Sequence, residues 1–257
     1  MKRFSLTLTY LTFFIISAVL LGLVLYAPLP ALIESLASPE IRFAILLSLV
    51  TSVVSTFICV IIAVPVAYSL ARYQFFGKRI TTLALTLPLT LPPLVAGIAL
   101  LLFFGTTPWG KALEQAGFMV IFTPLGIIVA EVFVNLPYMI RILRSAYTTI
   151  NPRYEYVAKT LGCTDTGAFL QVTLPMARPG LVTGSVITWS KAMGEFGAVL
   201  MLAGATTMRT ETLPIALYLN ISAGDLDLAV AAATILILIS LVTLCVVEYF
   251  DRGVNVF

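Results

Sequence analysis

Two charged side chains, Lys191 and Glu195, stand four positions apart in the otherwise apolar stretch WSKAMGEFGAVLMLAG. On one helix this spacing places both on the same face, where they can pair. Charges at membrane depth are costly and usually face the interior of a helix bundle or a wet cavity. We therefore expect the pair at a gate or on a path for a polar solute. The alternative is a self-neutralised pair that anchors its helix. Glu131 and Asn135 form a weaker version of the same pattern.

Three threonines, Thr82, Thr86 and Thr90, recur every four residues and so share one face of a helix. Prolines interrupt the hydrogen-bond ladder within and just after that face, at Pro88, Pro92 and Pro93. A row of hydroxyls on a broken helix suits the passage of a polar solute. The alternative is that each hydroxyl bonds back to a carbonyl of its own helix.

The chain lacks most of the residue patterns that enzymes use for catalysis or for binding metals. The chain contains no histidine, which removes the commonest general base and metal ligand. The run GTTPWGK, ending at Lys111, matches the start of a phosphate-binding loop, but Ala112 stands where Ser or Thr must hold magnesium. Cysteines have neither metal-ligand nor redox-pair spacing; they are Cys59, Cys163 and Cys245. We therefore expect no enzyme, metal or cofactor site, and nucleotide hydrolysis would belong to another polypeptide.

Composition places these residues in a membrane. Hydrophobic residues make up 60% of the chain and charged residues 11%, against about 25% charge in soluble domains. Long apolar runs predict six membrane-spanning helices in one transmembrane domain, residues 1–257. These spans are expected at about 6–28, 43–71, 80–104, 119–140, 179–203 and 228–247. The fold class is all-α and integral to the membrane.

Lys and Arg in the loops set the orientation, because cytoplasmic loops carry an excess of both. With both termini in the cytoplasm, most basic residues fall inside: Lys2, Arg3, Arg72, Lys78, Arg79, Arg141, Arg144, Arg153, Lys159, Arg178 and Arg252. Those outside are Arg42, Lys111 and Arg209. The net charge of +3 therefore reflects topology and gives no reason to expect nucleic acid.

One long polar break, NPRYEYVAKTLGCTDTGAFLQVTLPMARPGLVTG, begins at Asn151 on the basic side. Asn151 followed by proline is a good helix start, and Gly162 supplies a left-handed stop. A second short helix is expected to start at Thr164 or Asp165 and to end at Pro175. A compact helical knob in the main cytoplasmic loop of a membrane protein predicts a surface for a partner.

This pattern resembles the cytoplasmic signature of ABC importer permeases, in which Glu-Ala-Ala, Gly and Leu-Pro at fixed spacing dock into the ATPase. Glu155 stands one place before the signature's acidic position, which Tyr156 occupies. The other positions that match are Ala158, Gly162, Val172, Leu174 and Pro175. The resemblance makes residues 145–178 a coupling loop.

Two further segments, LPPLVAGIALLLFFG and GEFGAVLMLAG, look like the permeases that import tetrahedral oxyanions, molybdate and tungstate above all, with sulfate and thiosulfate permeases as close relatives. The resemblance implies a type I ABC importer fold in the plasma membrane and a homodimer. It also implies a separate ATPase subunit and an extracytoplasmic substrate-binding protein.

Two other classes of protein compete with this interpretation. An ion-coupled secondary carrier would use Lys191 and Glu195 for coupling, but such carriers tend to contain internal repeats, and no convincing repeat joins the two halves. A membrane scaffold without transport would not need buried charges or a row of hydroxyls.

Overall fold

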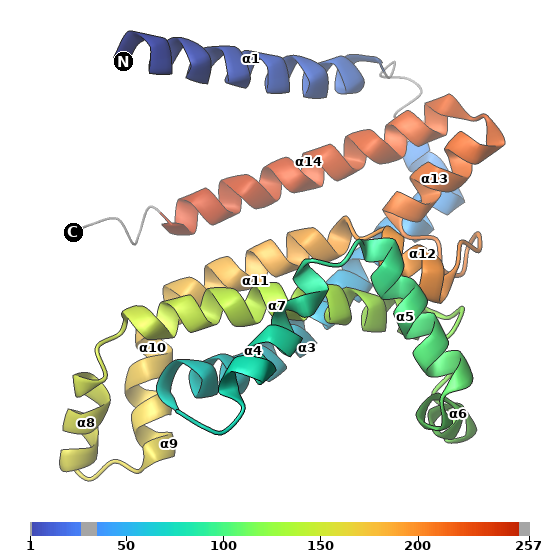
Figure 1. The fold of residues 1–257 in the computed structure, drawn as a ribbon. Coiled ribbons are helices and arrows are strands. Elements are labelled where there is room, and N and C mark those ends of the chain that lie inside the picture. Colours follow the sequence, from blue (N-terminus) through green and yellow to red (C-terminus); the bar gives the residue numbers. More distant parts are fainter. Residues whose placement is uncertain (1, 27–34, 252–257) are drawn as a thin grey trace. The chain divides into compact units, whose positions relative to one another are not determined.

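The computed structural model describes residues 2–26 and 35–251, and every regular element in them is helical (Figure 1). Arg252 and the end of the expected first span, residues 27–28, lie outside the described residues. The helices are α1 (Lys2–Tyr26), α3 (Pro39–Arg72), α4 (Lys78–Thr86), η1 (Leu87–Leu89), α5 (Pro93–Thr106), α6 (Pro108–Gln115), α7 (Pro124–Thr149), α8 (Arg153–Thr160), α9 (Asp165–Ala168), η2 (Phe169–Thr173, a π-helix), α10 (Leu174–Met176), α11 (Arg178–Met193), α12 (Gly197–Ala203), α13 (Leu213–Ala223) and α14 (Leu226–Asp251).

Four of these helices, α1, α3, α7 and α14, are long and apolar enough to cross a membrane. Two bent pairs raise the number of possible spans in the described residues to six. One pair joins α4 and η1 to α5 with a bend of 111°, and the other joins α11 to α12 with a bend of 59°. The all-helical fold class is thereby confirmed.

The breaks lie where the backbone cannot continue a helical ladder. Pro92 has an extended backbone (φ −56°, ψ 135°) and starts α5 in a new direction. Pro65, by contrast, lies inside α3, which continues through it. A proline is tolerated there because neighbouring helices can satisfy the freed carbonyl.

The chain divides into two compact units. One is built on Ser48–Gly204; the other contains α1, the residues before Ser48, and Ala205–Leu241. In the second unit, the apolar window of α1 has no buried residue, whereas the first turn of α13 is buried, from Leu213 to Ala216.

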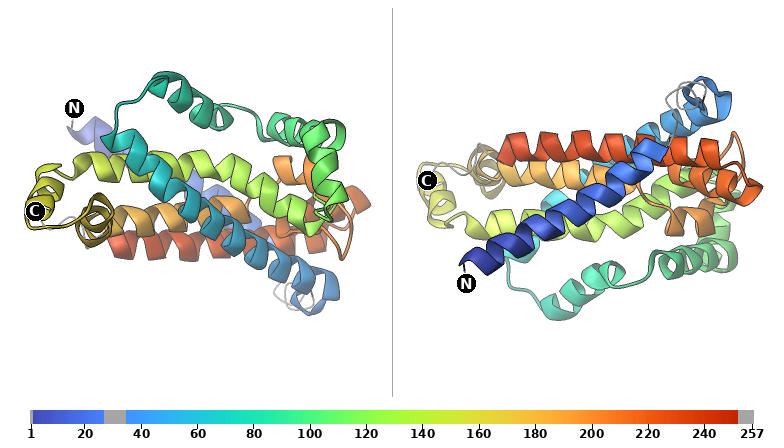
Figure 2. Two further views of the ribbon diagram at one scale, coloured as in Figure 1. Left: turned by 90° about the horizontal axis from the view of Figure 1, so that it is seen from below. Right: turned by 90° about the horizontal axis from the view of Figure 1, so that it is seen from above.

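The first unit is built around α7 and α11. Gly184 of α11 lies so close to α7 that a β-carbon there would stand 2.9 Å from the sulfur of Met139. α4 has no buried residue and lies to one side of this pair in both views of Figure 2. At the end of the pair where α7 stops, α8 and the α9–α10 segment project side by side (Figure 1).

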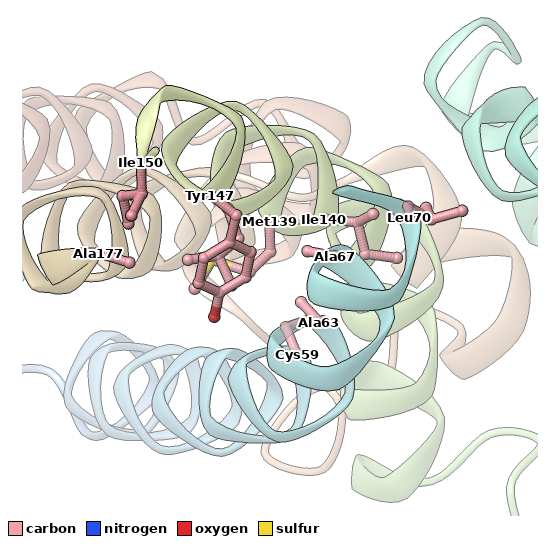
Figure 3. Packing of buried hydrophobic residues seen from close by; sticks show 10 residues of the cluster. Cys59, Ala63, Ala67, Leu70, Met139, Ile140, Tyr147, Ile150 and Ala177 are labelled. Atoms are coloured by element: carbon pink, nitrogen blue, oxygen red, sulfur yellow. The ribbon is translucent and has the colours of Figure 1, made fainter. Parts of the chain in front are cut away.

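A buried cluster joins the end of α7 to α3. Small side chains recur every four residues on α3, at Cys59, Ala63 and Ala67, and let the two helices approach closely. Tyr147 of α7 is wholly buried against this row. Figure 3 shows its ring among these side chains and Met139, so the base of the projecting segment rests on a packed core.

Candidate functional site

The projecting segment begins with α8, whose two ends are both capped. Asn151 accepts a hydrogen bond from the Arg153 N–H at 3.0 Å through its Oδ1. At the other end, Gly162 has φ +96°. Its N–H donates to the Lys159 carbonyl, and the Cys163 N–H donates to the Ala158 carbonyl, each at 3.0 Å. This pair of bonds is a Schellman closure, so the predicted stop at Gly162 is confirmed.

The second helical segment of the knob begins and ends close to where the sequence predicts. Thr164 caps α9 by accepting from the Gly167 N–H at 3.1 Å, and Lys159 pairs with Asp165 across the turn. The segment continues through η2 into α10, which ends at Met176, one residue after the predicted end at Pro175. Ala177 is a turn, and α11 begins at Arg178.

Glu155 points into the protein. Its side chain is 7% exposed, and its Oε1 lies 2.8 Å from Nε of Arg72, at the end of α3. The Thr173 hydroxyl donates to the same oxygen at 2.8 Å. The Tyr68 hydroxyl donates to Oε2 at 3.0 Å. One carboxylate therefore ties α8 to both α3 and η2.

The surroundings of Glu155 favour the charged form of its carboxylate. Burial by itself raises the pKa of Glu155, but hydrogen bonds from Thr173, Arg72 and Tyr68 and the charge of Arg72 outweigh it and hold the pKa below its usual value. Arg72 also donates from Nη2 to the Ile150 carbonyl at 3.0 Å. The guanidinium thus bridges the end of α3, the residue after α7, and α8.

The uncovered surface of α8 carries large apolar and aromatic side chains beside two exposed basic residues, Arg153 and Lys159. Tyr154 is 54% exposed, Tyr156 63%, Val157 57% and Leu161 81%. Ala158 is buried beside Glu155 on the inward face. Of the other residues that match the signature, Val172 and Leu174 are half-buried and Pro175 is exposed. α8 therefore presents aromatic and aliphatic side chains outward, and the Glu155 carboxylate faces inward.

The hydroxyls of the threonine row bond back to carbonyls of their own helical segment, which is the second of the two alternatives given above. Thr82 donates to the Lys78 carbonyl and Thr86 to the Thr82 carbonyl, both at 2.8 Å. Thr90 donates to the Leu87 carbonyl at 2.9 Å. These hydroxyl protons are engaged within the chain, which leaves only oxygen lone pairs for a solute.

Lys191 and Glu195 do not share a helix face, because α11 ends at Met193. The Lys191 ammonium lies 4.2 Å from the centre of the Tyr138 ring. Glu195 accepts from the Ala198 N–H at 3.0 Å, in the first turn of α12. The expectation of a pair along one face is therefore wrong. Lys191 instead lies in the last turn of α11, and Glu195 lies within the break between α11 and α12.

Sequence reasoning missed the partners of Glu155. Tyr68 and Arg72 lie more than eighty positions before it in the chain, and no spacing rule connects them. The one available signal was that Arg72 is a basic residue at the end of a long apolar helix. Among the described residues, no group of three or more His, Cys, Asp or Glu could hold a metal.

The fold and the knob together define an integral membrane protein of the transporter type. A family model described as "binding-protein-dependent transport system inner membrane component" matches residues 61–256. The chain belongs to this family and is a multi-pass membrane protein.

Relatives narrow the family further. The molybdenum transport system permease protein ModB of Mycobacterium tuberculosis is 40% identical over 208 residues, which cover 80% of this chain and 78% of the relative. The sulfate transport system permease protein CysW of Synechocystis sp. is 33% identical over 221 residues, 86% of this chain and 80% of the relative.

A solved structure supports the fold. A bacterial alginate ABC transporter in complex with its alginate-bound periplasmic protein contains a chain that matches with a TM-score of 0.74 at 19% identity. The match covers 99% of this chain and 95% of that one. At this identity the likeness shows the fold alone.

Proposed function

We propose that this chain is the permease subunit of an ABC importer for a tetrahedral oxyanion, with molybdate or tungstate as the first substrates to test. The 40% identity to the ModB permease supports this choice. The 33% identity to CysW makes sulfate or thiosulfate the alternative. Substrate selection would lie mainly in a separate extracytoplasmic binding protein.

The knob is the observation that carries the proposal. α8 is capped at both ends and held from inside by Glu155, while Tyr154, Tyr156, Val157 and Leu161 are left uncovered. A membrane protein gains nothing from ordering an apolar face that no partner covers. The occupant that fits is a separate ATPase subunit, which would supply the energy for transport.

The assembly follows from the same proposal. Two copies of the chain would form the path, each with both termini in the cytoplasm and a coupling loop at 145–178. The apolar window of α1, unburied in a single chain, supplies surface for a second copy or for lipid. Lys191 and Glu195, at the break between α11 and α12, would lie at a gate. Thr82, Thr86 and Thr90 would line its approach by turning their hydroxyl protons from the helix carbonyls to the passing oxyanion, which accepts hydrogen bonds.

Uptake into proteoliposomes tests this function. The chain is reconstituted with the ATPase that co-purifies with it and with the binding protein, and entry of molybdate, tungstate and sulfate is measured. We expect ATP-dependent accumulation of one oxyanion. Accumulation by the chain alone, without ATPase but with an ion gradient, would instead establish a secondary carrier.

A further inference from the structure

The interior of the knob contains a charged pair that docking to a partner does not require. Arg72 and Glu155 are 9% and 7% exposed at their side chains, and their atoms meet at 2.8 Å. Burying two charges is costly unless the geometry is good and the remaining hydrogen-bonding positions are filled. Here Tyr68 and Thr173 fill the carboxylate positions, and the Ile150 carbonyl accepts from the guanidinium. Both carboxylate oxygens of Glu155 therefore have partners.

These contacts join four segments through one polar network, beside the apolar packing between α3, α7 and η2. Tyr68 and Arg72 lie at the end of α3, Ile150 follows α7, Glu155 lies on α8, and Thr173 ends η2. The covalent links of α8 to the rest of the chain are short turns before Arg153 and after Thr160. Turns of this kind absorb φ/ψ changes and act as hinges. Without the carboxylate, α8 would be free to tilt on both of them.

Aromatic packing fixes the other side of the same joint. The Tyr68 ring lies 4.6 Å from that of Phe169 and 5.8 Å from that of Tyr147. Tyr147 is wholly buried in the core between α3 and α7. The hydroxyl of Tyr68 thus holds Glu155 from a ring that cannot move without disturbing that core.

The outward position of the signature is filled by a different kind of residue. Tyr156, which occupies the acidic position of the family pattern, is 63% exposed, whereas the Glu155 carboxylate is turned inward onto Arg72. The two tasks are divided between neighbours in the sequence. One side chain faces a partner and the next holds the helix to the membrane domain.

We propose that Glu155 is a positioning residue that locks α8 to the end of α3 through Arg72, so that a push on the knob moves the membrane helix and is not lost in the flanking turns. The residue acts from inside and does not itself contact the ATPase. This inference deepens the proposed function and rests on it, because a push requires an ATP-driven partner.

The first test needs no ATPase. Amide hydrogen exchange is measured on the full-length chain in nanodiscs for the wild type, Glu155→Gln and Glu155→Ala. We expect exchange in residues 153–160 to rise about tenfold or more in Glu155→Ala, because local opening follows lost contacts. Exchange in α7 and α11 should stay within about twofold. Unchanged exchange in α8, or an equal rise in all helices, would overturn the proposal.

A matched set of variants separates the lock from the contact surface. Arg72→Gln/Glu155→Gln removes both charges and leaves none unpaired, so its α8 should exchange more slowly than that of Glu155→Gln alone. Tyr156→Ala changes the outward face and should leave α8 exchange as in the wild type. If Arg72→Gln speeds α8 exchange as much in the Glu155→Gln background as it does in the wild type, the two side chains act independently and the charged pair is not the lock.

The second test uses the complex with the ATPase. We expect Glu155→Gln to retain the ATPase on co-purification while the oxyanion transported per ATP hydrolysed falls about tenfold. Tyr156→Ala should instead lose the ATPase. Loss of the ATPase from Glu155→Gln with unchanged α8 exchange would make Glu155 a contact residue and overturn the inference. Failure of the wild type to bind any ATPase would refute the proposed function, whatever the exchange data show.

Discussion

Gly97 of α5 lies so close to Ala198 of α12 that a β-carbon on Gly97 would stand 2.8 Å from the Ala198 Cα. At the same crossing, a β-carbon on Gly197 would stand 3.1 Å from the Leu94 backbone nitrogen. Both obstacles are main-chain atoms, so no side-chain rotation can relieve the overlap. The second halves of the two bent spans are therefore packed backbone against backbone.

Gly97→Ala should consequently destabilise the protein. Forcing a methyl group into a filled crossing costs about 1–3 kcal/mol, which we expect to see as a lower midpoint of thermal unfolding in detergent. Gly22→Ala is the control, since nothing lies within 4 Å of a β-carbon there. Equal midpoints for Gly97→Ala and the wild type would show that α5 and α12 separate without cost.

The glycines of α11 show what spacing can and cannot predict. Gly180 and Gly184 are four positions apart, the spacing of small residues at a tight helix interface. A β-carbon on Gly180 would stand 2.5 Å from Ala146 Cβ, and Gly184 faces Met139 of the same helix, α7. Small residues at this spacing reveal that something approaches closely. They do not say which helix, because every span is equally apolar.

The sequence predicts the helix caps of the knob correctly, but it does not predict contacts between residues that are far apart in the chain. Asn151 and Gly162 act through atoms within a few positions of themselves, so their roles are written in the sequence nearby. The inward direction of Glu155 depends on Arg72, which comes from another helix. Lys191 and Glu195 were misplaced as a pair because α11 ends at Met193, where Gly194 and Glu195 start a bend.

Gly162→Pro should uncouple the knob more severely than Gly162→Ala. Alanine only has to adopt φ +96°, at a cost of about 1–2 kcal/mol. Proline cannot adopt that angle and also loses the N–H that donates to the Lys159 carbonyl. We expect ATPase co-purification or ATP-coupled uptake to fall in the order wild type, Ala, Pro, with membrane insertion unchanged. Full coupled uptake in Gly162→Pro would show that the knob does not couple ATP hydrolysis to transport.

Glu211 should make stability depend on pH in the opposite sense to Glu155. Burial raises the pKa of Glu211, the bond from the Met208 N–H lowers it in part, and the charge of Glu40 raises it further. Its pKa in the folded chain lies above the unfolded value, so its contribution is complete below the unfolded pKa and is lost as pH rises through the folded pKa. Glu211→Gln should therefore unfold at a higher temperature than the wild type at pH 8.

That advantage should disappear below about pH 4, where the unfolded carboxyl is also protonated. The measurement is a series of thermal melts in detergent between these two limits. Glu114→Gln, at an exposed site, serves as the control for changes in net charge. An advantage that grew as the pH fell would show that the Glu211 carboxyl is favoured in its charged form.

Asn135 offers a stabilising substitution inside the membrane. It is 1% exposed, and neither its Oδ1 nor its Nδ2 has a hydrogen-bond partner in the part of the chain that the structure describes. A buried amide without partners costs about 1–3 kcal/mol, so Asn135→Leu, which keeps the branching at Cγ, should raise the midpoint of thermal unfolding. Asn220→Leu is the matched control, because Asn220 Nδ2 donates to the Ala216 carbonyl at 2.9 Å and its loss brings no such gain. A lower midpoint for Asn135→Leu would mean that the amide finds its partner in water, in a second copy of the chain or in the transported solute, and uptake by the same variant would then tell the solute from the other two.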